Sequence, residues 1–186
     1  MLKSALQTRQ RGLTLVELAV TVALSAILVG IAVPSFSAWQ GNSRIRASAD
    51  TIHAGLRLAR AESITRNTSV TFTLQANGDW TVSCTTVTTQ CPANIHSRPG
   101  AEIRGGLSLV ATQRNSVVAS GAAVVTFNSL GQPDVVDASL RRVDITVPTS
   151  IVPTAQSRAM RITLTDLGQT RLCDPAATNG TPTACS

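Results

Sequence analysis

The hydrophobic pattern divides the chain into three stretches of different character. In the first, from Leu13 to Val33, Glu17 is the only formally charged residue among 21. A helix of that length is about 31 Å long, close to the thickness of the hydrocarbon core of a bilayer. Pro34 follows directly. The first stretch therefore predicts a membrane helix over residues 13–34.

The second stretch has the period of an amphipathic helix. Small and apolar residues recur there at i, i+4, i+7, i+11, i+14 and i+18, which places them on one helical face. Most of the charged residues lie off that face. We expect the helix to continue over residues 35–67 and to bury this stripe against the rest of the chain. The stripe consists of Ile45, Ala49, Ile52, Leu56, Ala59 and Ser63.

The third stretch, residues 68–186, alternates as strands do, with turn-forming residues such as Asn77 and Gly78 between the segments. The Thr- and Ser-rich segments 85–100 and 148–157 are expected to be loops. No internal repeat and no linker long enough for a second domain are visible. The pattern predicts an α+β fold in which one long helix packs on an antiparallel sheet. The expected strands are 69–74, 80–84, 107–110, 117–119, 122–127, 140–147, 158–164 and 169–173.

The residues before the apolar run are positively charged. The first twelve contain Lys3, Arg9 and Arg11 and no acid, which predicts a cytoplasmic N-terminus and translocation of the remainder. A buried core helix is one alternative, but an all-round apolar run at a chain end is rarely core. A cleaved secretory signal peptide is another, but its best cleavage site, 32–34, includes a proline.

Glu17 favours an uncleaved membrane helix in which the acid has a function. A carboxylate near the bilayer centre costs about 2.5–3.5 kcal/mol, and less near the interface, so it is a functional candidate by default. Glu17 lies about one turn inside the apolar run, and the helix has no Lys or Arg within reach of it. A free N-terminal amine of another chain would be a suitable partner.

The residues around Glu17 carry a family resemblance. The segment Arg11-Gly12-Leu13-Thr14-Leu15-Val16-Glu17 resembles the class III leader of type IV pilins and pseudopilins. The resemblance implies that a membrane prepilin peptidase removes residues 1–12 by cutting between Gly12 and Leu13. It also implies that the peptidase methylates the new amine of Leu13, which stands where phenylalanine is commonest.

Two further positions match this family. After cleavage Glu17 would be the fifth residue (17 − 12 = 5), where the family has an acid. Pro34 would be the twenty-second (34 − 12 = 22), where pilus-type pilins often have a helix-kinking proline. In a filament without water around the stems, the Leu13 amine of one chain and the Glu17 carboxylate of a neighbour would neutralise each other. Glu17 and Pro34 are therefore the expected assembly residues.

Segments further along the chain resemble one particular family of pilin-like proteins. Residues 59–67 with Val70, the tryptophan Trp80, residues 127–131 and residues 161–171 are similar to the H-type pseudopilin and FimT/FimU minor-pilin family. This implies a minor pilin that is incorporated into, or primes, a type IV pilus, with no enzymatic activity. It also implies insertion in the inner membrane with a periplasmic C-terminal domain, and contact with other pilins through the N-terminal helix. A minor pseudopilin of type II secretion is the alternative.

The charge composition bears on a further alternative, DNA uptake in natural transformation. The net charge is +6, but loss of the leader would leave 13 arginines against 10 acids, or +3. Some FimT-type pilins bind DNA through a G-R-x-R motif, and this chain keeps Gly168 and Arg171 but has Gln169. The resemblance implies non-sequence-specific contact with double-stranded DNA phosphates there. The nearby arginines that could assist are Arg141, Arg142, Arg158 and Arg161.

The four cysteines follow the expected membrane helix and would lie on the periplasmic side, where disulfides persist. Four cysteines allow three connectivities, and we favour the local pairs Cys84–Cys91 and Cys173–Cys185. A zinc site is the alternative, but no C-x-x-C spacing occurs and His53 and His96 lie in unrelated segments. We expect no bound metal and no cofactor.

Overall fold

The computed structural model describes residues 14–100, 106–114 and 121–185, with the backbone alone for residues 31–35. Its internal contacts divide it into two compact units, Met1–Phe36 and Ser37–Ser186. Within the described residues, no helix combines the length and the apolar character that crossing a bilayer requires. Leu13, the expected first residue of a membrane helix, lies outside them.

A single helix, α1 (Leu15–Thr65, 51 residues), contains most of the first two hydrophobic stretches. It begins after Thr14, whose side-chain Oγ1 accepts a hydrogen bond from the backbone N–H of Glu17 at 3.2 Å. This bond satisfies one of the amide groups that have no partner within the first helical turn, and the Thr-x-x-Glu spacing is that of a capping box. The backbone is helical through Pro34.

In the N-terminal unit, the apolar side chains of α1 are exposed. Leu15, for example, is 84% exposed. A helix that is apolar on all sides is normally covered by protein or lipid, and within the described residues of this unit nothing covers these side chains. The large apolar side chains that are more than half exposed here are Leu15, Val16, Leu18, Val20, Val22, Leu24, Ile27, Leu28, Val29 and Phe36.

In the Ser37–Ser186 unit, α1 buries the predicted stripe, whose apolar members are at most 1% exposed. Ser63 is also buried, and its hydroxyl donates a hydrogen bond to the carbonyl of Arg60 at 2.8 Å, so its polar atom is satisfied. The helix ends at Thr65, and Asn67 has a φ of 49°, the left-handed conformation that commonly terminates helices. The amphipathic continuation and its end near Asn67 agree with the sequence prediction.

The first sheet has the order β3-β2-β1-β5, with antiparallel neighbours throughout. The predicted hairpin joins β1 to β2, and it has Gly78 at φ 83° and a hydrogen bond from the Gln75 N–H to the Asp79 carbonyl at 2.8 Å. Alternate residues of β1 and β2 are buried, as the period of a strand requires. The strands are β1 (Val70–Leu74), β2 (Trp80–Cys84), β3 (His96–Arg98) and β5 (Ala123–Phe127).

The second sheet has the order β4-β6-β7-β8 and is also antiparallel. The register between β4 and β6 shifts after Thr112, so that Arg141 is the extra residue of a β-bulge. A short 3-10 helix, η1 (Thr154–Gln156), precedes β7. The strands are β4 (Ser108–Gln113), β6 (Leu140–Thr146), β7 (Met160–Leu164) and β8 (Thr170–Cys173).

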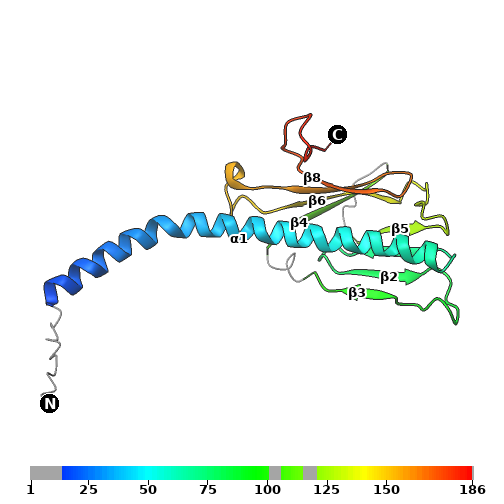
Figure 1. Ribbon diagram of the computed structural model, residues 1–186, viewed down its shortest axis with the longest axis horizontal. Coiled ribbons are helices and arrows are strands. Elements are labelled where there is room, and N and C mark those ends of the chain that lie inside the picture. Colours follow the sequence, from blue (N-terminus) through cyan, green and yellow to red (C-terminus); the bar gives the residue numbers. More distant parts are fainter. Residues whose placement is uncertain (1–13, 101–105, 115–120, 186) are drawn as a thin grey trace, which may run out of the picture. The chain divides into compact units, whose positions relative to one another are not determined.

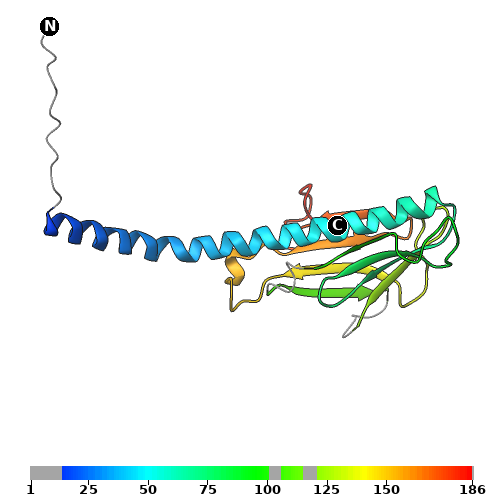
Figure 2. The ribbon, with the colours of Figure 1, turned by 90° about the horizontal axis from the view of Figure 1, so that it is seen from below.

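The part of α1 from residue 37 onward lies against both sheets, with β2 and β3 on one side of it and β6 and β8 on the other (Figures 1 and 2). Side chains from the helix and from both sheets form one hydrophobic core. Its fully buried members include Leu56, Phe72, Phe127, Ile145 and Ile162, each at most 1% exposed. The predicted α+β architecture is confirmed.

The strands differ from the prediction in two respects. They form two four-stranded sheets and not one. β3 lies inside the segment 85–100, where a loop was expected. All three of its residues are exposed, so no apolar alternation marks this strand in the sequence. Its backbone pairing with β2, such as Val82 opposite His96, holds it in place. The expected strand 117–119 lies outside the described residues.

Candidate functional site

The expected processing and assembly residues lie at the start of the chain. Gly12 and Leu13 are outside the described residues, whereas Glu17 lies in the first turn of α1 and is exposed. No Lys or Arg occurs between Leu13 and Ser43, so the helix supplies no cation for this carboxylate. The exposed apolar side chains from Leu15 to Val29 surround it along the chain. A charge on such a surface requires a partner from another molecule once the surface is covered.

Pro34 lies inside the helical segment, at the boundary of the two compact units. A proline has no backbone N–H, so one i to i−4 hydrogen bond of α1 is missing there. Its side chain lies outside what the structure describes.

The structure joins the cysteines in the two local pairs, Cys84–Cys91 and Cys173–Cys185. The first closes the loop after β2, where the Thr88 N–H also donates to the Cys91 carbonyl at 2.9 Å. The second attaches the C-terminal tail to the end of β8. Over the described part of the chain, no group of three or more His, Cys, Asp or Glu side chains could hold a metal ion.

Gly168, proposed above as a DNA contact, has a packing role in the turn between β7 and β8. Its φ is 75°, and a Cβ at this position would lie 2.1 Å from the carbonyl oxygen of Gly131. The same oxygen accepts a hydrogen bond from Arg60 Nε at 3.1 Å. Three segments that are distant in sequence therefore meet at one carbonyl, and only glycine permits this approach.

Arg171 lies on the outer face of the second sheet. It is exposed, pairs across the strands with Thr163, and donates a hydrogen bond from Nη2 to the Pro182 carbonyl at 3.3 Å. Arg142 and Arg161 lie on the same face, because Arg142 also pairs with Thr163 and Arg161 is two residues away on β7. Two of the four arginines expected to assist in DNA binding thus lie on the same face as Arg171.

Asp144 reduces the positive charge of this face. Its carboxylate lies 3.0 Å from Arg142 Nε and 2.5 Å from Arg161 Nε, and its side chain is only 17% exposed. The remaining two arginines lie elsewhere. Arg141, at the bulge, bonds to the Asp134 carbonyl and lies 3.4 Å from Asp166, and the backbone of Arg158 bonds to Asn42 on α1.

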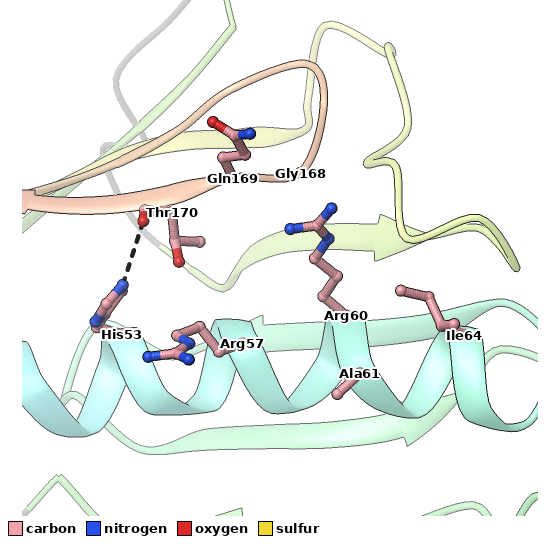
Figure 3. A pocket seen from close by; sticks show the side chains of 8 residues that line it. All are labelled: His53, Arg57, Arg60, Ala61, Ile64, Gly168, Gln169 and Thr170. Carbon is pink, nitrogen blue, oxygen red and sulfur yellow. Dashed lines mark hydrogen bonds between the residues drawn. The ribbon is translucent and has the colours of Figure 1, made fainter.

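A pocket of about 500 Å³ lies between one flank of α1 and the β7–β8 turn (Figure 3). We call it the helix-flank pocket. His53 Nε2 is 3.4 Å from the Thr170 carbonyl, which links helix and turn at one end of the pocket. The sequence pattern gives no reason to group these residues, because the helix and the β7–β8 turn are more than 100 positions apart. The pocket is lined by His53, Arg57, Arg60, Ala61, Ile64, Gly168, Gln169 and Thr170.

Two crystal structures are similar to this chain, both of the type IV minor pilin FimU from Pseudomonas aeruginosa. At 14% identity, one has a TM-score of 0.45 over 73% of this chain and 95% of its own. The other, also at 14% identity, has a TM-score of 0.44 over 71% and 98%. No curated protein sequence matches the chain.

Two family matches cover most of the sequence. Residues 7–33 match the prokaryotic N-terminal methylation motif, which includes the second half of the expected leader and the whole apolar run. Residues 48–181 match the family of type II transport protein GspH, which includes residues 48–65 of α1 and both sheets. Proteins of this pilin-like type are structural and not enzymes. The chain has a prepilin-type N-terminal methylation motif, and it belongs to the family of type II transport protein GspH.

Proposed function

We propose that this protein is a minor type IV pilin of the FimT/FimU kind, which is incorporated into a type IV pilus or primes its assembly. The observation that carries the proposal is the N-terminal methylation motif over residues 7–33, which overlaps the start of a helix whose apolar side chains are exposed there. Prepilin peptidase would cut between Gly12 and Leu13 and methylate the Leu13 amine. Other pilins would then become its partners.

The physical chemistry of the N-terminal unit supports this order of events. The positive leader keeps the N-terminus in the cytoplasm while the apolar segment is anchored in the inner membrane. On assembly, lipid around the segment is replaced by the stems of neighbouring subunits. Glu17 would then need the positive charge of a neighbour's Leu13 amine, because an unpaired buried charge is strongly destabilising.

The processing step is tested by the intact mass of the protein recovered from purified pili. The expected mass is that of residues 13–186 plus one methyl group. A chain recovered with residues 1–12 still attached would contradict the proposal. Substitution of Gly12 by a larger residue, for example Gly12→Val, should leave the leader in place and serves as the matched control.

A minor pseudopilin of the type II secretion system is the second candidate, and the match of residues 48–181 to the GspH family favours it. The two functions separate in a deletion strain. Loss of surface pili with normal secretion of exoproteins supports the pilus function, and the reverse result supports secretion. Complementation with the full chain is the control.

DNA uptake is a third candidate and stays a prediction. The convergence of Arg142, Arg161 and Arg171 on one face supports it, and the pairing of the first two with Asp144 weakens it. Any contact there would be with phosphates of double-stranded DNA, because a content of 3% aromatic residues argues against a surface on which bases stack.

A further inference from the structure

The helix-flank pocket has no part in the processing and assembly described above, yet it has the chemistry of a binding site. His53, Arg57 and Arg60 are spaced i, i+4 and i+7, so they project from one flank of α1. None of the eight residues that line the pocket is acidic. Arg57 is exposed and forms no hydrogen bond or ion pair with any described residue. The pocket therefore presents positive charge that no described residue neutralises.

The walls of the pocket are held in position by contacts within the unit. Arg60 Nε donates to the Gly131 carbonyl, and His53 Nε2 lies within 3.4 Å of the Thr170 carbonyl. The Arg60 guanidinium extends from the helix toward the turn that contains Gly168 (Figure 3). Its position is fixed through Nε, while its terminal nitrogens remain for a ligand. A preorganised site of this kind loses less conformational entropy on binding.

The pocket is apolar at its other end, where Ala61 and Ile64 line it and Ile64 is 50% exposed. Along the helix axis, Ile64 lies about 6 Å from Arg60. In an extended peptide, side chains two residues apart point the same way and are about 6.6 Å apart. An acidic residue followed two positions later by an apolar residue therefore matches the spacing of the two ends.

We propose that the helix-flank pocket binds an extended acidic segment of a neighbouring pilin subunit. A carboxylate of the segment pairs with Arg57 and Arg60, and an apolar side chain two residues further on covers Ala61 and Ile64. The identity of the partner rests on the proposed function. Nucleic acid fits less well, because its phosphates favour cations spread along an open surface, whereas this site is concave and half apolar.

The test uses the full chain, ¹⁵N-labelled and purified in detergent micelles. The probe is a capped peptide with the sequence Ala-Glu-Ala-Leu-Ala, and a peptide with Gln in place of Glu is its control. We expect saturable amide shifts around Arg57, Arg60 and residues 168–170. The Gln peptide should bind about tenfold more weakly, since it lacks the charge-assisted hydrogen bonds.

The variant Arg57→Gln should weaken binding of the acidic peptide by about tenfold. Arg46→Gln, at an exposed arginine of α1 that does not line the pocket, should leave binding unchanged. Equal affinity for the two peptides, no effect of Arg57→Gln, or no saturable binding would overturn the proposal. So would displacement of the peptide by a 20-base-pair DNA duplex, or acetate binding as tightly as the peptide. This assay needs neither processing nor filaments, so a failure to bind the peptide would not contradict the proposed function. Failure of the processing or pilus experiments would likewise not contradict peptide binding at the pocket.

Discussion

The two halves of α1 share one backbone conformation but differ in what covers them. Leu28, in the Met1–Phe36 unit, is 68% exposed, whereas Leu56, in the Ser37–Ser186 unit, is 1% exposed. The first half has apolar side chains around its whole circumference. The second half has them on one face, and its own sheets bury that face.

The difference shows that the two halves of α1 are stabilised by different contacts. The second half is stabilised within the chain, so its substitutions should change the free energy of unfolding. The first half is exposed in the part of the chain that the structure describes, so its substitutions should change membrane anchoring or assembly while the folded domain persists. Each of the following experiments challenges one side of this contrast.

The largest effect is expected for Glu17→Ala. If the Leu13 amine of a neighbour is left unpaired among apolar stems, each contact loses about 3–5 kcal/mol, enough to abolish incorporation. Incorporation is measured by immunoblot of purified pili, with membrane fractions assayed in parallel. Glu62→Ala is the control, because Glu62 bonds to Arg66 on the second half of α1. Normal incorporation of Glu17→Ala would remove the assembly role of this acid.

Leu56→Ala should destabilise the domain by about 2–5 kcal/mol, because it opens a cavity in the core between helix and sheets. Leu28→Ala removes the same atoms from an exposed site and should change the free energy of unfolding by less than about 0.5 kcal/mol. Chemical denaturation of the full chain in detergent, followed by circular dichroism, measures both. Similar losses in the two variants would show that the N-terminal half is also covered within the chain.

Gly168→Ala should cost about 2–4 kcal/mol, because it combines left-handed strain with a contact of 2.1 Å to the Gly131 carbonyl. Gly180→Ala is the matched control. Gly180 has a φ of 94° and no atom within 4 Å of an added Cβ, so only strain of about 1–2 kcal/mol applies there. Thermal unfolding of the two variants compares them. An equal loss would mean that the turn can move away from Gly131.

The smallest effect is expected for Arg171→Ala on DNA binding. Removal of one phosphate contact should make the negative slope of log affinity against log salt shallower by about 0.9. Arg142→Ala should change the slope less, because Asp144 already pairs with Arg142. A gel shift of the full chain with a DNA duplex at low ionic strength measures this. The absence of salt-sensitive binding by the unsubstituted chain would contradict the DNA hypothesis.

The sequence predicted the features that depend on neighbouring residues. The stripe from Ile45 to Ser63 repeats with the period of a helix, and the hairpin at Gly78 lies between two alternating segments. The disulfide Cys84–Cys91 spans only seven positions. Such features can be predicted because backbone periodicity and turn chemistry act over a few residues. β3 was missed because its pairing with β2, and not its own pattern, makes it a strand.

Only the tertiary structure decided which distant residues meet. Arg60 and Gly131 are 71 positions apart, yet they share a hydrogen bond. The ion pairs of Asp144 with Arg142 and Arg161 also depend on the packing of strands. They reduce the positive charge of a face that the number of arginines alone would suggest is basic. Local periodicity carries no information on such contacts, because they arise when helix and sheets bury a common core. The leader motif and the apolar run thus indicate the protein family from the sequence alone. The helix-flank pocket is formed only when the helix packs against the β7–β8 turn in the folded domain.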